Sequence, residues 1–198
     1  MLSNPIVLGA VILVSLTSTY ILISKDWRFC IGAMAVQYIG VFLLVDASWP
    51  VEMAVAKMVA GWMAGAILGI AMNSAPDTWN ESEKSIKFGP VFRILAALIL
   101  ALTTTSLVLH SETWLSMIST PIRWGSFMLI SLGLLQISLT NHPLKVIIGL
   151  LTSISGFEII YAAIETSTLV TGLLAGVNLG LALVGAYLLI APTMESNP

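Results

Sequence analysis

Long apolar runs alternate with polar connections along the chain, and these are mostly short except for one substantial loop from Asn73 to Gly89. The runs are about 20 residues long, which is the length an α-helix needs to cross the roughly 30 Å hydrocarbon core of a bilayer. They lack the strict alternation of apolar and polar residues that barrel strands show, so the pattern predicts an all-α transmembrane bundle. About seven spans are predicted, at 5–23, 29–45, 51–72, 89–109, 121–140, 144–164 and 168–190.

The composition agrees with this pattern and excludes several classes of function. Hydrophobic residues make up 58% of the 198 residues and charged residues 9%, far outside the range of soluble domains. The net charge of -2 gives no sign of a nucleic-acid partner, and the lone Cys30 permits no internal disulfide. The sequence has no glycine-rich phosphate loop, no Cys/His metal cluster and no nucleophile motif. We therefore expect neither a cofactor or metal nor covalent chemistry on this chain, which leaves its status as an enzyme uncertain.

Basic residues predict the orientation in the membrane, because Lys and Arg are more common in cytoplasmic loops. If the N-terminus is outside, only Arg123 lies clearly outside, while Lys57 lies within the third span. We therefore expect a multi-pass protein of the inner (cytoplasmic) membrane, with its N-terminus outside and its C-terminus inside. The basic residues on the expected cytoplasmic side are Lys25, Arg28, Lys84, Lys87, Arg93 and Lys145.

The stretch GFEIIYAAIE, residues 156–165, places carboxylates in or beside the sixth span. One helical face carries Thr152, Ser155, Glu158 and Glu165. Glu158 lies near the middle of the span, displaced a little toward the outer surface of the membrane. An ionised carboxylate at the bilayer centre costs ~2.5–3.5 kcal/mol on insertion scales, so it needs water, a partner or a protein interior. Glu158 is either a protonatable relay or a group that only holds helices together. Glu165, at the membrane boundary, is either part of the relay or an ordinary interfacial carboxylate.

Three more polar side chains lie within predicted spans. Lys57, about two turns from the outer end of its span, could neutralise Glu158 or Glu165, or could extend to the outer headgroups. Gln37 and Asn178 lie near the centres of their spans and need hydrogen bonds there. Such amides more often link helices than line a pathway.

Two predicted spans carry glycines at every fourth position, a spacing that allows another helix to approach closely. We expect helix packing on both sets, which are Gly61, Gly65 and Gly69 in the third span and Gly172, Gly176 and Gly180 in the seventh.

Most of the chain resembles a known family. The C-terminal segments LKVIIGLLTSISGFEIIYAA and GLLAGVNLGLALVGAYLL resemble spans two and three of the K subunit of bacterial complex I and of the C subunit of multisubunit cation/proton antiporters. The N-terminal segment SLTSTYILISKDWRFCIGAMAVQYIGVFLL is similar to hydrogenase-4 component E, in which a K-subunit-like portion follows extra helices. The resemblance divides the chain into an N-terminal extension, 1–110, and a K-subunit-like portion of three helices, 111–198.

The resemblance implies roles for individual residues. Glu158 takes the place of the first intramembrane glutamate of the K subunit, and Lys145 that of the basic residue before it. The family's second intramembrane glutamate falls on Gly176, which cannot carry a proton, and Lys57 is a candidate to compensate.

The implied function is that of a membrane subunit of a redox-driven complex that translocates H⁺ or Na⁺. Its implied partners are antiporter-like subunits, hydrogenase or dehydrogenase membrane subunits and the lipid bilayer. Two alternatives stay open: a purely structural membrane subunit, and a small self-contained transporter. The transporter would need its own binding site, and the sequence shows neither an inverted repeat nor a pair of broken spans.

Overall fold

The computed structural model describes residues 5–75 and 89–195, and these residues form helices joined by short connections. The predicted helical bundle is confirmed, and the helix bounds agree with the predicted spans to within about three residues, except that the last helix extends five residues further. Lys84 and Lys87 lie outside the described residues. The elements are α1 (Pro5–Ile23), α2 (Trp27–Asp46), α3 (Val51–Ser74), α5 (Pro90–His110), the short 3₁₀ helix η1 (Ser111–Thr113), α6 (Thr120–Ser138), α7 (Pro143–Ile164) and α8 (Thr168–Glu195).

Proline and side-chain caps explain where several helices begin. Pro90, Pro121 and Pro143 stand in the first turns of α5, α6 and α7, where a missing N–H breaks no helical hydrogen bond. At the start of α2, the Asp26 carboxylate accepts a hydrogen bond from the Arg28 N–H. These helix starts are therefore encoded by residues next to them in the sequence.

Among the described residues, six helices are long and apolar enough to cross a membrane. The remaining long helix, α6, contacts α1, α5 and α7. The chain is therefore a multi-pass membrane protein with a helical-bundle fold.

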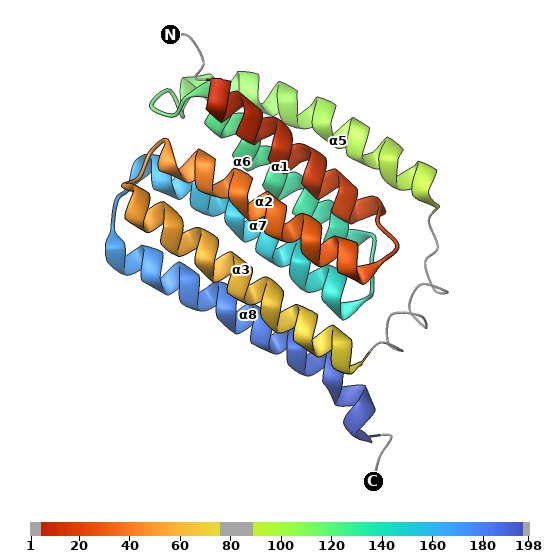
Figure 1. The fold of residues 1–198 in the computed structure, drawn as a ribbon. Helices are drawn as coiled ribbons and strands as arrows, with labels where there is room; N and C mark the ends of the chain where they lie inside the picture. Colours follow the sequence, from red (N-terminus) through yellow and green to blue (C-terminus); the bar gives the residue numbers. More distant parts are fainter. Residues whose placement is uncertain (1–4, 76–88, 196–198) are drawn as a thin grey trace.

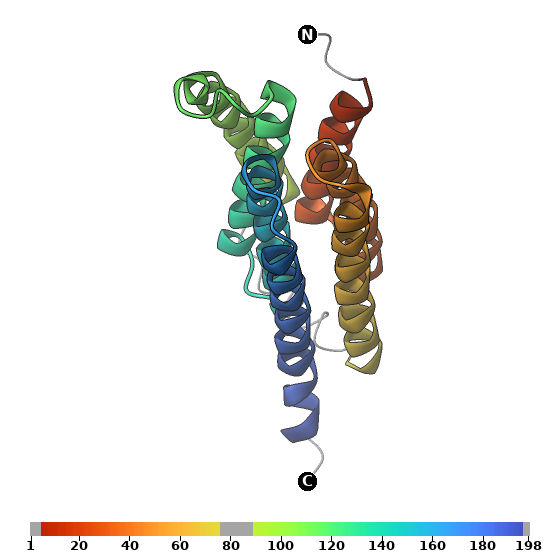
Figure 2. The same ribbon diagram turned by 90° about the vertical axis from the view of Figure 1, so that its left-hand side faces the viewer.

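The helices form two layers that lie face to face. Successive helices run antiparallel, so that α1 begins and α8 ends at opposite ends of the bundle (Figure 1). One layer holds α1, α2 and α3, and the other holds α6, α7 and α8, with α1 against α6, α2 against α7 and α3 against α8 (Figure 2). Helix α5 lies at the edge, beside α6 and α1. Helix α7 thus has its neighbours α6 and α8 on either side and α2 across the layers.

Helices α6 and α7 approach each other closely at the level of their backbones. A Cβ added to Gly156 would lie 2.6 Å from the Ser126 carbonyl oxygen, and one added to Gly149 would lie 2.9 Å from the Gly133 carbonyl oxygen. A Cβ added to Gly133 would in turn lie 2.6 Å from the Gly149 carbonyl oxygen. Only glycine allows this approach, so these glycines fix the position of α7 against α6.

The two glycine sets predicted from spacing differ in the structure. A Cβ on Gly61 would collide with the Tyr38 ring, and one on Gly65 would lie 3.2 Å from the Met34 Cε, so this part of α3 packs tightly on α2. Gly69 has only an ordinary contact, 3.8 Å from Ile31.

The second set does not show the predicted close packing within this chain. A Cβ on Gly172, Gly176 or Gly180 would meet nothing within 4 Å. Helix α8 packs on α3 through other positions, among them the fully buried Ala182. The four-residue spacing predicts that glycines share a face, but it does not say which face turns inward.

Candidate functional site

One face of α7 carries a line of buried polar side chains. Lys145, Thr152, Ser155 and Glu158 are each at most 2% exposed. Their spacing of seven, three and three residues places them on one side of the helix, and the line extends about 20 Å at 1.5 Å per residue. The predicted polar face of α7 therefore points into the protein.

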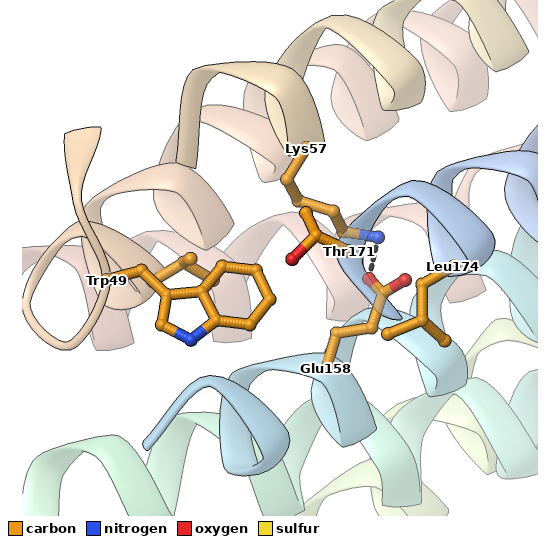
Figure 3. Close-up of a pocket in the computed structure, with 6 residues that line it drawn as sticks. Trp49, Lys57, Glu158, Thr171 and Leu174 are labelled. Atoms are coloured by element: carbon orange, nitrogen blue, oxygen red, sulfur yellow. Dashed lines mark ion pairs between the residues drawn. The ribbon is translucent and has the colours of Figure 1, made fainter. Parts of the chain in front are cut away.

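At the Glu158 end of this line, three helices bring charged and polar groups together. Lys57 of α3 forms an ion pair with Glu158 of α7, and both side chains are at most 4% exposed (Figure 3). From α8, the Asn178 Nδ2 donates a hydrogen bond of 3.2 Å to Glu158 Oε1. Of the two carboxylates proposed as partners for Lys57, the structure pairs it with Glu158. Because the two opposite charges lie together, each offsets much of the cost of removing the other from water, and neither could be buried as a charge without its partner.

The packing of α2 against α3 positions Lys57. Lys57 and Gly61 are four residues apart and share a helical face. Because Gly61 has no side chain, the Tyr38 ring fits against α3 there, and its centroid lies 5.4 Å from the Lys57 Nζ. The Tyr38 and Ser155 hydroxyls lie near each other where α2 contacts α7. The ammonium group is thus directed between the layers, toward Glu158.

A small cavity adjoins the ion pair. It has room for about one water molecule. Near it, the Trp49 Nε1 donates a hydrogen bond of 2.7 Å to the Glu165 backbone carbonyl, and the Trp49 ring meets the Tyr161 ring edge-on with centroids 6.2 Å apart. The residues that line the cavity are Val45, Trp49, Lys57, Glu158, Thr171 and Leu174 (Figure 3).

Nearer the middle of the bundle, a second group of polar side chains links both layers. Gln37 of α2 donates a hydrogen bond of 3.2 Å to the Thr152 hydroxyl of α7. Its amide oxygen accepts one of 3.3 Å from Ser18 of α1. Both ends of the buried amide are therefore hydrogen-bonded, which is the usual requirement for such a group in an apolar interior.

The Lys145 end of the line is built from backbone contacts. The Lys145 Nζ donates a hydrogen bond of 2.8 Å to the carbonyl oxygen of Ser24, which directly follows α1. The Lys145 carbonyl in turn accepts one of 2.7 Å from the Gln136 amide of α6. A cation near the C-terminal end of a helix also interacts favourably with the helix dipole. Lys145 therefore joins the start of α7 to the end of α1.

Glu165 does not belong to the buried line. It is the residue after α7, it is exposed, and its side chain accepts a hydrogen bond of 3.2 Å from the Thr166 N–H. The shared face predicted from spacing ends at Glu158, because the helix ends at Ile164 and the backbone turns away. In the structure Glu165 is an exposed carboxylate at the helix end.

Several residues of the site were not anticipated from the sequence. Tyr38 and Gln136 are polar side chains within apolar spans, a signal that could have identified them. Trp49 lies between two spans, a position typical of an aromatic residue at the membrane interface. The sequence does not indicate that Trp49 or Thr171 lies beside Glu158.

The arrangement suits charge and proton chemistry more than metal binding. No group of three His, Cys, Asp or Glu side chains that could hold a metal ion occurs in the described parts of the chain.

Comparisons with known proteins add no assignment, since no family model, no curated protein and no solved structure matches the chain.

Proposed function

We propose that this chain is a membrane subunit of a redox-driven complex that moves H⁺ or Na⁺, and that Glu158 with Lys57 is one station on the ion path. The buried ion pair carries the proposal. It lies where α3, α7 and α8 meet, with Asn178 as a third partner. Ionisable groups inside a membrane protein are costly and commonly mark ion and proton pathways.

The chemistry of the pair explains how such a station works. When Glu158 takes up a proton, its carboxyl becomes neutral and Lys57 loses its counter-charge. In a medium of low dielectric constant this change is felt strongly by neighbouring ionisable groups, so proton occupancy of the two residues is coupled. Asn178 provides an amide that hydrogen-bonds the carboxyl group. A charge change in an adjacent subunit would therefore shift the protonation of Glu158.

The distribution of charged residues supports the proposed orientation, with the N-terminus outside the cytoplasmic membrane. Lys25, Arg28 and Lys145 lie at the end of the bundle where α1 meets α2 and α6 meets α7. The opposite end carries acidic residues and the basic residue Arg123. Lys and Arg favour the cytoplasmic side, so the Lys57–Glu158 pair belongs to the outer half of the bilayer. The acidic residues are Asp46, Glu52, Glu112 and Glu165.

The proposed partners are antiporter-like subunits and hydrogenase or dehydrogenase membrane subunits of the same complex. The support is the resemblance of the sequence to hydrogenase-4 component E and to the K subunit of complex I. Electron transfer would take place on those partners and drive ions past Glu158. Because Gly176 replaces the second family glutamate, Lys57 is the second ionisable group of this station.

The decisive experiment measures ion uptake by membrane vesicles that contain the intact assembly. We expect Glu158→Gln to abolish uptake of H⁺ or Na⁺ while electron transfer continues at equal subunit content. Glu165→Gln is the matched control, since it makes the same chemical change on an exposed carboxylate seven residues away. If Glu158→Gln destabilises the subunit, the double variant Lys57→Gln/Glu158→Gln removes both charges together and tests the same point. Unchanged uptake in these variants would refute the relay.

A purely structural subunit is the second candidate. Its support is the same pair, because Asn178, Lys57 and Glu158 link three helices and leave no net charge buried. In that case Glu158→Gln lowers stability but leaves the ratio of ions moved to electrons transferred unchanged.

A further inference from the structure

The ion pair forms part of the wall of a cavity that lies toward one end of the bundle. Trp49 belongs to the α2–α3 connection, and Thr171 is in the first turn of α8. Val45 is near the end of α2. The cavity is therefore on the side of Lys57 and Glu158 that faces the α2–α3 and α7–α8 connections (Figure 3).

The groups around the cavity suit a water molecule. Lys57 Nζ and Glu158 Oε2 contact each other but make no further hydrogen bond with the described residues. The Thr171 hydroxyl donates a hydrogen bond of 3.0 Å to the Ser167 carbonyl, and its oxygen remains able to accept one. A buried water usually has two to four polar partners, and these three groups surround a space of about the right size.

On the opposite side the buried polar line of α7 continues through Ser155 and Thr152, and tightly packed apolar side chains enclose it. Met34, Leu68, Ile148 and Leu151 have no exposed surface and belong to one cluster between α2, α3 and α7. Protein interiors of this kind contain few voids that could admit water. The path from solvent to the pair is therefore shorter from the cavity side.

Trp49 lines the cavity on the side of the α2–α3 connection. Its side chain is 6% exposed, and it is fixed both by the hydrogen bond to the Glu165 carbonyl and by the ring contact with Tyr161. The residue thus links the α2–α3 connection to the end of α7 beside the cavity.

We propose that this cavity is a water site through which Glu158 exchanges protons with one end of the bundle only, and that Trp49 limits the entry of water. A hydronium ion in the cavity gives a proton to the Glu158 carboxylate: one O–H bond of the hydronium breaks, a carboxyl O–H bond forms, and a water molecule remains. No electrons are transferred. The inference deepens the proposed function, but access to the cavity can be measured without any ion transport.

The test is the reactivity of a thiol placed in the cavity, with the full chain in its assembly in sealed vesicles. Thr171→Cys is combined with Cys30→Ala, and the probe is a small charged thiosulfonate that does not cross membranes, applied from either face. Thr113→Cys and Lys25→Cys, on exposed residues at opposite ends of the bundle, identify the faces.

We expect slow reaction of the cavity thiol with Trp49 intact, and reaction at least about tenfold faster after Trp49→Ala, because reactivity follows the population of the open form. The faster reaction occurs only from the face that labels Thr113→Cys. Trp49→Phe, which keeps a ring but loses the hydrogen bond to Glu165, gives an intermediate rate and carries the test if Trp49→Ala does not fold.

The matched control is Trp62→Ala. The Trp62 Nε1 also donates to a backbone carbonyl, that of Ala35 at 3.0 Å, but this side chain is 43% exposed and does not line the cavity. Equal reaction from both faces, no reaction in any variant, or an acceleration by the Trp49 variants no greater than that by Trp62→Ala would overturn the proposal. One-sided reaction together with normal ion uptake in Glu158→Gln would keep the water site and reject the relay.

Discussion

Two buried lysines, Lys145 in the α7 line and Lys57 of α3 at the other end of that line, have similar exposure and different surroundings. Lys145, 2% exposed, donates to the backbone carbonyl of Ser24, whereas Lys57, 4% exposed, pairs with Glu158. A carbonyl cannot change its charge, so the hydrogen bond from Lys145 to Ser24 joins two helix ends without a switch in charge. A carboxylate can be protonated, so the second contact can switch. Burial beside a carboxylate is therefore the feature of Lys57 that supports the proposed ion path.

The two sites also differ in their depth along the helices. Lys145 is in the first turn of α7, close to a connection, while Lys57 is two turns into α3 and Glu158 is two turns from the end of α7. Desolvation of a charge is more costly deeper in the bilayer. Lys57 therefore depends on its partner more strongly than Lys145 does, and the difference can be measured.

The largest effect is expected from separating the charges of the pair. Glu158→Gln leaves Lys57 buried without a counter-charge, and removal of one partner of a buried pair typically costs about 3–5 kcal/mol. We expect Lys57→Met/Glu158→Met to recover most of this loss, since apolar residues of similar volume often replace a buried pair without penalty. Thermal unfolding of the purified subunit in detergent measures both. A single variant as stable as the wild type would show that the pair contributes little.

A smaller effect is expected at the other lysine. Lys145→Met removes a charge-assisted hydrogen bond to Ser24, worth about 1.5–3 kcal/mol, and Lys145→Arg should retain most of it. Uptake of ions per folded assembly should not change. If Lys145→Met instead stops uptake at normal stability, both lysines belong to the path and the contrast between them is lost.

Between the two lysines, Gln37 tests whether the polar line is continuous. Gln37→Leu removes the hydrogen bonds to Thr152 and Ser18, at a net cost of about 1–2 kcal/mol, and leaves both lysines in place. Unfolding measurements and ion uptake should be compared on the same preparation. A loss of stability with normal uptake would show that Gln37 is structural and that the ion path does not run along the line toward Lys145. A loss of uptake without a loss of stability would show that the path continues through Gln37.

The smallest effect is expected at Glu165. Because it is exposed, Glu165→Gln should change the free energy of unfolding by no more than about 0.5 kcal/mol and leave uptake unchanged. A large effect on uptake would place this residue at the mouth of the path and extend the site beyond Glu158.

The helices were predictable from the sequence because length and apolar content determine a membrane span almost locally. Pro143 before an apolar run identifies the start of α7 without any knowledge of its neighbours. Orientation and partners stay predictions, since both depend on groups beyond the bundle.

The site was only partly predictable because it depends on which helix faces meet. Lys57 and Glu158 could be matched by depth, but Asn178 becomes a partner of Glu158 only through the contact of α7 with α8. Likewise, Gly133, Gly149 and Gly156 form the close helix contact, whereas the regular set at Gly172, Gly176 and Gly180 does not. Periodicity gives the face of a helix, and only tertiary packing gives its neighbour.

The distance in sequence between the two charged partners has a consequence for biogenesis. Lys57 is synthesised about 100 residues before Glu158. At roughly 5–20 residues per second, the first three helices spend about 5–20 s in or near the membrane before the carboxylate is made. During this interval the Lys57 side chain can extend toward the headgroups, because it lies near the end of its span. The three N-terminal helices can therefore span the membrane before the partner of Lys57 exists. Only after α7 inserts can the Lys57–Glu158 ion pair form and hold the two layers together.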